Sequence, residues 1–139
     1  MNENQVARQV LDACFTIHRT LGPGMLESIY EKVLVYELSQ SGLRIRRQVP
    51  IPVIYKGMPI GLGFRADLIV EDLVVVELKS VEYVLPLHKK QELSYLRLLH
   101  MKLALLINFN APLLREGITR VVNHLDDPLD IDRTFKASS

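Results

Sequence analysis

The sequence has a single cysteine, Cys14, and no long apolar run. One cysteine excludes a disulfide framework within the chain and any zinc site built from cysteines, and it is typical of a reducing compartment. The longest unbroken apolar runs, Leu73–Val76 and Leu103–Ile107, are far too short to span a bilayer. The first residues are polar and contain no apolar signal core, so we expect a cytoplasmic protein with no membrane segment.

The sequence also lacks a large excess of charge of either sign, because its net charge is only +1. The charge is unevenly distributed, with ten basic and six acidic side chains in residues 41–102 and a small acidic excess on either side. The local excess of four positive charges favours a polyanionic partner such as nucleic acid. Ordinary solvated faces of helices and strands would produce the same pattern.

The size and composition are those of one globular domain. The chain has 139 residues, of which 48% are hydrophobic and 24% charged, which excludes a disordered or collagen-like protein. A chain of this length can bury a full hydrophobic core. We expect a single domain over residues 1–124, followed by a polar, acidic C-terminal tail over residues 125–139.

Periodicity predicts helices first and strands after them. Apolar residues three and four apart predict one helix over residues 4–20 and another over 25–41, separated by the Gly22–Gly24 turn. Val- and Ile-rich segments predict strands over residues 44–55, 59–70 and 73–79. A third helix beginning near Pro86, a buried strand over 103–108 and a strand or short helix over 117–123 complete the pattern. This order predicts the α/β class, with a central mixed β-sheet flanked by helices.

A charged trio lies at the end of this run of strands. Glu77 and Lys79 are two residues apart on one strand, so their side chains share a face. Asp67 would lie opposite Glu77 if the connecting loop has an odd number of residues, such as Glu71–Leu73. Two converging carboxylates suit Mg²⁺, which prefers oxygen ligands, and a nearby lysine can assist a nucleophilic water or stabilise a developing charge. A plain ion pair at the rim of the sheet would use the same residues.

Two helices add candidates to this trio. Glu27 heads the apolar stripe of the second helix, where it is either a third acid of the cluster or a charge favoured by the helix dipole. On the third helix, Gln91 and Tyr95 are four residues apart and share a face, with His88 before them. They either belong to the same site or form a surface hydrogen bond.

The motifs resemble a known family. Residues 24–30 read G-x-x-E-x-x-Y, and the blocks 64–80, 91–99, 105–110 and 115–123 follow in matching order and spacing. Across residues 8–124 the sequence resembles the GxxExxY proteins, which look like minimal members of the PD-(D/E)XK nuclease superfamily. The resemblance implies a restriction-endonuclease-like core.

It also implies roles for individual residues. Asp67, Glu77 and Glu27 would form the metal site, with Asp67 as the central ligand, Glu77 as the second and Glu27 as the helix-borne acid that shapes the site through a water. Lys79 would position the attacking water. Gln91 and Tyr95 match a Q-x-x-x-Y motif that helps to hold the site and the nucleic-acid backbone.

The sequence therefore predicts a nuclease dependent on Mg²⁺ (or Mn²⁺) that acts on DNA in preference to RNA. Cutting both strands of a duplex symmetrically would take two copies, so we expect a homodimer. We expect further contacts to nucleic acid from a histidine and five basic side chains, namely His88, Arg44, Arg46, Arg47, Lys89 and Lys90. The alternatives are a non-catalytic nucleic-acid-binding or regulatory module on the same fold, and a purely structural domain.

Overall fold

The computed structural model describes residues 1–125, so the predicted tail lies outside the described residues apart from Leu125. Within this part, five strands form one mixed sheet in the order β1-β2-β3-β4-β5. The strands are β1 (Ile45–Tyr55), β2 (Met58–Val70), β3 (Val74–Lys79), β4 (Leu103–Asn108) and β5 (Ile118–Val122). β3 and β4 are parallel, and the other neighbours are antiparallel. The predicted α/β class with a central mixed sheet is confirmed.

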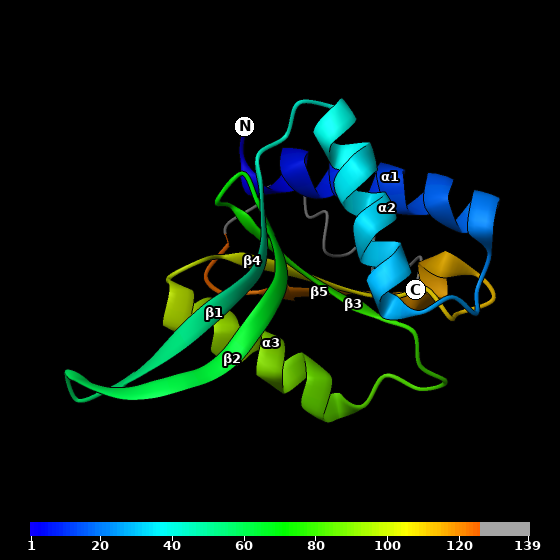
Figure 1. The fold of residues 1–139 in the computed structure, drawn as a ribbon. Coiled ribbons are helices and arrows are strands. Elements are labelled where there is room, and N and C mark those ends of the chain that lie inside the picture. The colour runs from blue at the N-terminus through cyan, green and yellow to red at the C-terminus, as the bar shows by residue number, and fades with distance from the viewer. Residues whose placement is uncertain (126–139) are drawn as a thin grey trace.

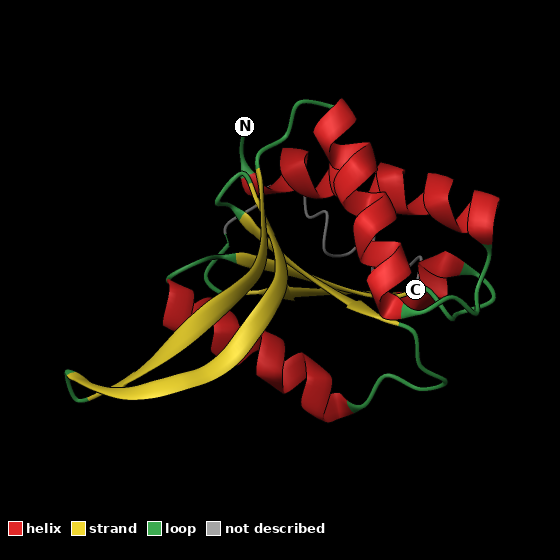
Figure 2. Cartoon of the chain, viewed as in Figure 1, coloured by secondary structure: helices red, strands yellow, loops and turns green. Residues whose placement is uncertain are grey.

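Helices cover both faces of the sheet (Figures 1 and 2). α1 (Glu3–Leu21) and α2 (Glu27–Gln40) pack on one face, and α3 (Pro86–Leu99) packs on the other as the crossover between β3 and β4. α1 begins with a capping box, in which Asn2 and Gln5 exchange side-chain to backbone hydrogen bonds of 2.9 Å. Pro86 occupies the first turn of α3, where a missing N–H leaves no hydrogen bond unmade.

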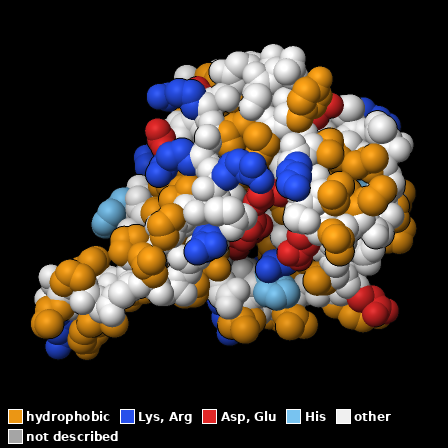
Figure 3. Space-filling view, viewed as in Figure 1, with side chains coloured by type: hydrophobic (Ala, Val, Ile, Leu, Met, Phe, Trp, Pro, Cys, Tyr) orange, Lys and Arg blue, Asp and Glu red, His pale blue; other side chains and the backbone are white. Residues whose placement is uncertain are grey.

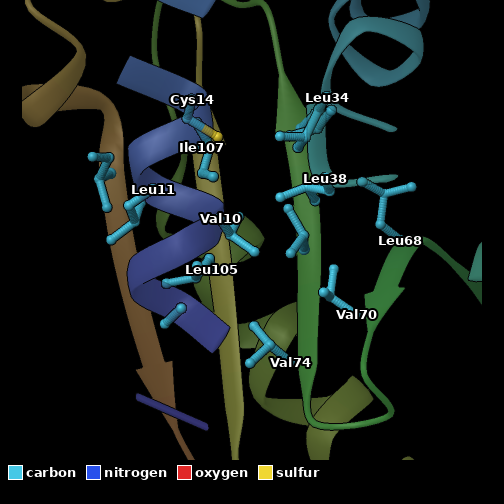
Figure 4. Packing of buried hydrophobic residues seen from close by; sticks show 14 of the residues in the cluster. Val10, Leu11, Cys14, Leu34, Leu38, Leu68, Val70, Val74, Leu105 and Ile107 are labelled. Carbon is cyan, nitrogen blue, oxygen red and sulfur yellow. The ribbon is translucent and has the colours of Figure 1, made fainter. Parts of the chain in front are cut away.

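The larger core lies between the sheet and the two N-terminal helices (Figure 4). Val10, Leu11 and Cys14 of α1 face Leu105 and Ile107 of β4. Burial raises the pKa of the Cys14 thiol, so this cysteine serves as an apolar core residue. Each such aliphatic side chain contributes about 1.5–3 kcal/mol on burial.

The core on the α3 side is smaller. Ile69 of β2, Val75 of β3 and Ala104 of β4 pack against Tyr95 and Leu96 of α3. The fewer apolar side chains on this face leave its other positions to polar groups. The two faces of the sheet are therefore unequal, and the α3 face is the one that contains the predicted functional residues of β2 and β3.

β1 and β2 form a long hairpin that projects from the body of the molecule (Figure 1). Its turn is Lys56-Gly57, with positive φ at both residues, as a two-residue hairpin turn with the right twist requires. β2 pairs with β3 only over Leu68–Val70, so the outer part of the hairpin is a two-stranded ribbon. It exposes a series of apolar side chains: Ile54, Tyr55, Met58, Ile60 and Leu62.

The predicted last element is a strand, and a short helical turn that was not predicted precedes it. Residues Leu114–Gly117 form a 3₁₀ turn, η1, and β5 follows at Ile118. Gly117 is required here, because a Cβ atom would lie 2.3 Å from the backbone oxygen of Asn108. The open choice between a strand and a short helix over residues 117–123 is thus resolved as a strand.

Candidate active site

The site is organised by the point at which β2 and β3 separate. Their ladder ends at the pair Leu68 and Val76, and the loop between the strands has three residues. This odd number places Asp67 opposite Glu77, as predicted. Beyond the ladder, the carboxylates take over the hydrogen bonding. Glu77 Oε1 accepts from the amide of Asp67 at 2.9 Å, and Asp67 Oδ2 accepts from the amide of Leu78 at 2.8 Å.

The face that carries this pair is the one covered by α3. Val76 and Leu78 of β3 point to the opposite core, so the alternation of β3 directs Glu77 and Lys79 towards α3. The hydrogen bonds between the strands hold Asp67 beside Glu77. Glu77 is 5% exposed, whereas Asp67 and Lys79 are half-buried. The trio predicted from the sequence therefore comes together on one face.

A further acid on α3, absent from the sequence predictions, joins the group. Glu92 is 3% exposed and interacts electrostatically with Asp67 and Lys79. It lies three residues before Tyr95 and shares a buried helix stripe with it. That i, i+3 spacing was the available sequence signal, since residues three apart on a helix share a face.

Burial and mutual repulsion alter the titration of these acids. Burial, followed by the charges of Glu92 and Asp67, raises the pKa of Glu77 to about 10. Burial, followed by the charge of Asp67, raises the pKa of Glu92 to about 8, while the charge of Lys79 acts in the opposite direction. Without a cation, Glu77 and Glu92 therefore hold their protons to a higher pH than ordinary glutamates do.

Tyr95 and the start of α3 border the acids. Burial and the charges of Glu77, Glu92 and Asp67 raise the pKa of Tyr95 to about 12, and its ring packs on Phe64 at a centroid distance of 4.8 Å. Gln91 is half-buried on the same helix. His88 accepts a hydrogen bond at Nδ1 from the amide of Leu85 at 3.1 Å and so caps α3.

A second polar group reaches Asp67 from the α2 side. Glu31 of α2 is 8% exposed and accepts hydrogen bonds from Arg47, at 2.8 Å, and from Gln48. Gln48 also donates to Asp67 Oδ1 at 3.4 Å, and it has a φ of +49°, which side-chain-bearing residues rarely adopt. The sequence reasoning missed both Glu31 and Gln48. The periodicity of the strand gave no signal for the unusual backbone conformation.

Glu27 is the first residue of α2 and lies next to Ser80, which follows the C-terminal end of β3. Together with Ser80 and Asn110, Glu27 lines a surface pocket. Its Oε1 accepts from the amide of Ser80 at 3.2 Å. Tyr30, one helical turn on, stacks on Phe109 at 4.3 Å. Its hydroxyl donates to the carbonyl of Gly22 and accepts from the amide of Met25 at 3.1 Å, which fixes the turn that precedes Glu27.

The predicted basic contacts are dispersed. Arg44 and Arg46 pair with Glu71 and Asp72 at the β2–β3 turn, at 3.2 and 2.9 Å. The hydrogen bonds from Arg44 hold the pKa of Glu71 below its ordinary value. Lys89 and Lys90 are exposed in the first turns of α3. In Figure 3, acidic side chains lie in a hollow at the centre of this face, and basic side chains border it.

The donor set fits a hard divalent cation. The part of the chain that the structure describes contains no ready-made group of three His, Cys, Asp or Glu ligands. The Asp67–Glu77 pair is nevertheless the kind of partial carboxylate site that Mg²⁺ uses, with waters and substrate phosphates completing the shell. The fit rests on a property of the pair itself: a buried carboxyl group, Glu77, adjacent to a half-buried one, Asp67, whose mutual repulsion a cation would relieve.

A protein-family model described as PD-(D/E)XK nuclease superfamily matches residues 4–121. The chain belongs to this superfamily. No curated protein and no solved structure gives a significant match. The closer resemblance to the GxxExxY proteins stays a prediction.

The superfamily's name describes an acidic residue after a proline and a second acidic residue two positions before a lysine. Glu77-Leu78-Lys79 fits the second half, and Asp67 fits the first, although Ala66 stands where the name has proline. Ala66 is fully buried in the core on the α3 side, so the position is occupied by a small packed side chain. None of the helices described for this superfamily member is long and apolar enough to cross a membrane.

Proposed function

We propose that this protein is a magnesium-dependent nuclease that hydrolyses phosphodiester bonds in DNA. One observation carries the proposal: Asp67, Glu77 and Lys79 converge on one face, at the point where β2 and β3 part. The membership of a nuclease superfamily supports it. Mn²⁺ is expected to replace Mg²⁺, because both take carboxylate and water ligands.

The residues would divide the work. Asp67 and Glu77 would hold the cation, which when bound neutralises phosphate charge and lowers the pKa of its water. Lys79, as an ammonium, would donate hydrogen bonds to the attacking water or to a phosphate oxygen and stabilise the negative charge that develops there. Attack of water on phosphorus forms a new P–O bond and breaks the ester P–O bond to the leaving oxygen. The attacking water gives up a proton, and the leaving oxygen takes one.

The neighbours would position these groups. Tyr95 packs beside the acids, and Gln91 precedes it by one helical turn, which suits contacts to the nucleic-acid backbone. Glu27, held against Ser80, lies where it could reach the cation through water. Arg44, Arg46, Lys89 and Lys90 have exposed side chains that could attract the phosphate backbone. His88 has its Nδ1 committed to the helix cap, which leaves Nε2 for such a contact.

Two further proposals concern the setting of the reaction. Each chain offers one such site, so cutting both strands of a duplex symmetrically would take two copies, and we propose a homodimer. We place the reaction in the cytoplasm, in line with the single, buried cysteine.

The second candidate is a nucleic-acid-binding module that does not cleave. It is favoured by the fact that Asp67 and Glu77 already accept backbone hydrogen bonds and so have a structural role without a cation. The two candidates differ in what loss of the acids does: cleavage would vanish, whereas binding would survive.

The experiment is a cleavage assay on supercoiled, linear and single-stranded DNA and on RNA, with Mg²⁺, Mn²⁺ or EDTA. The variants are the double change Asp67→Asn, Glu77→Gln and, as a control that removes one acidic group far from the proposed site residues in sequence, Glu116→Gln, which is exposed on η1. We expect metal-dependent cutting by the wild type and by Glu116→Gln, and none by the double variant. Equal behaviour of all three proteins would contradict the proposal. Cutting of RNA alone would replace the substrate.

A further inference from the structure

One buried acidic atom has no partner. Glu92 is 3% exposed, and its Oε2 atom makes no hydrogen bond among residues 1–125. None of the ion pairs described for these residues includes Glu92. An ionised carboxylate in such a position is costly unless a positive charge or a hydrogen-bond donor compensates it.

Glu92 faces the acidic pair. α3 packs on β2 and β3 next to Asp67 and Glu77, where the charge of Glu92 acts on Glu77 and the charge of Asp67 acts on Glu92. Lys79 is the cation that acts on Glu92 from the same face. Three carboxylates and one ammonium leave an excess of two negative charges when all are ionised, which matches the charge of one divalent cation.

We propose that Glu92 is a third carboxylate of the divalent-cation site formed by Asp67 and Glu77. The inference rests on the proposed function, because it assigns a further ligand to the same site. In the described part of the chain, these three carboxylates do not form a group that is already positioned to hold a metal ion. A glutamate has three side-chain torsions, so a change of rotamer can bring its carboxylate to the cation while α3 stays in place.

The arrangement also explains why a buried glutamate occupies this stripe of α3. Tyr95 and Leu96, its neighbours on the stripe, make apolar contacts in the smaller core. A leucine at position 92 would extend that core, whereas the glutamate weakens it. A cation that binds the folded state and not the unfolded state would offset this loss of stability by mass action.

The test measures Mn²⁺ binding to the full chain by titration calorimetry, without nucleic acid. The proteins are the wild type, Glu92→Gln, Asp67→Asn and the exposed control Glu116→Gln. We expect the control to bind as the wild type does, Asp67→Asn to lose binding, and Glu92→Gln to bind about 10- to 100-fold more weakly. Wild-type affinity in Glu92→Gln together with loss in Asp67→Asn would overturn this inference and leave the proposed function intact. Failure of the wild type to bind Mn²⁺ would overturn both.

Thermal unfolding distinguishes the proposed role of Glu92 in cation binding from a purely structural role. We expect Glu92→Leu, in EDTA, to melt at or above the wild-type temperature, because it replaces a buried carboxyl group that has an unpartnered oxygen with an apolar side chain. The rise in Tm caused by Mn²⁺ should be smaller than in the wild type. A lower Tm in EDTA with an undiminished Mn²⁺ effect would contradict the proposal.

Discussion

Asp67 and Glu77 are joined by complementary hydrogen bonds: the amide of Asp67 donates to Glu77 Oε1, and Asp67 Oδ2 accepts from Leu78, the residue after Glu77. The two carboxylates thus replace the backbone pairing of β2 and β3 where the ladder ends. Each acid therefore has a structural role besides its proposed role in cation binding, and the choice of substitution decides which of the two is tested.

The structural role of Asp67 predicts that two substitutions at this position change the free energy of unfolding by different amounts. Asp67→Ala leaves the amide of the buried Leu78 without an acceptor, which should lower the free energy of unfolding by about 1–3 kcal/mol. Asp67→Asn retains an oxygen acceptor and should remain much closer to the wild type. Urea unfolding in EDTA measures both. Glu27→Ala is the matched control, because Ser80 is more accessible and water can replace the lost acceptor. Equal stability of the two Asp67 variants would contradict the argument.

The raised pKa values of Glu77 and Glu92 predict that the metal-free protein loses stability as pH rises. The folded state holds protons that the unfolded chain releases near the ordinary value of 4.5, so the loss extends from there to about 8 for Glu92 and to about 10 for Glu77. Thermal melting in EDTA between pH 5 and pH 9 should show it, and Glu77→Gln should flatten the decline. Mg²⁺ should restore stability at the alkaline end. A Tm of the wild type that rises with pH, relative to Glu77→Gln, would refute this account.

Lys79 is predicted to act on the reaction and not on cation affinity. Lys79→Met should reduce cleavage by about 100- to 1,000-fold, as loss of a preorganised donor does elsewhere. Its affinity for Mn²⁺ should be equal to or higher than that of the wild type, because a nearby positive charge is removed. Cleavage kinetics and calorimetry on the same preparation measure the two effects. Loss of Mn²⁺ binding in Lys79→Met would argue against this division of roles.

Tyr30 is predicted to hold the turn before Glu27. Tyr30→Phe retains the stacking on Phe109 but removes the hydroxyl that joins Gly22 to Met25, so we expect a loss of about 1–3 kcal/mol in unfolding free energy. Tyr36→Phe on the same helix is the control, because Tyr36 is 62% exposed. Urea unfolding compares the two. An effect of the same size in both would assign the loss to something other than the turn.

The sequence was sufficient for the framework of the fold and for the placement of Asp67 opposite Glu77. Periodicity predicted the elements in order, and the three-residue loop between β2 and β3 correctly placed Asp67 opposite Glu77. These features depend on residues close in sequence, where the alternation of side chains along a strand leaves few choices.

The supporting groups could not be predicted in the same way. Glu92 is a charged residue on a buried stripe, so its hydropathy argues for the solvent face. Gln48 adopts a left-handed backbone conformation that its residue type does not indicate, and Glu31 meets it only once α2 and β1 are packed together. The basic character of Arg44 and Arg46 suggested contacts to nucleic acid. Their ion pairs with Glu71 and Asp72 could not be predicted, because they depend on how β1 pairs with β2 in the folded protein.

The ribbon formed by the outer parts of β1 and β2 gives the sheet a steep gradient of local stability. Two strands with no third neighbour are marginal in water, whereas β4 is buried along its whole length between β3 and β5. Backbone amides near the Lys56-Gly57 turn should therefore exchange with solvent deuterium long before those of β4. A protease specific for basic residues should also cut first after Lys56, at a point outside the packed core that supports Asp67 and Glu77.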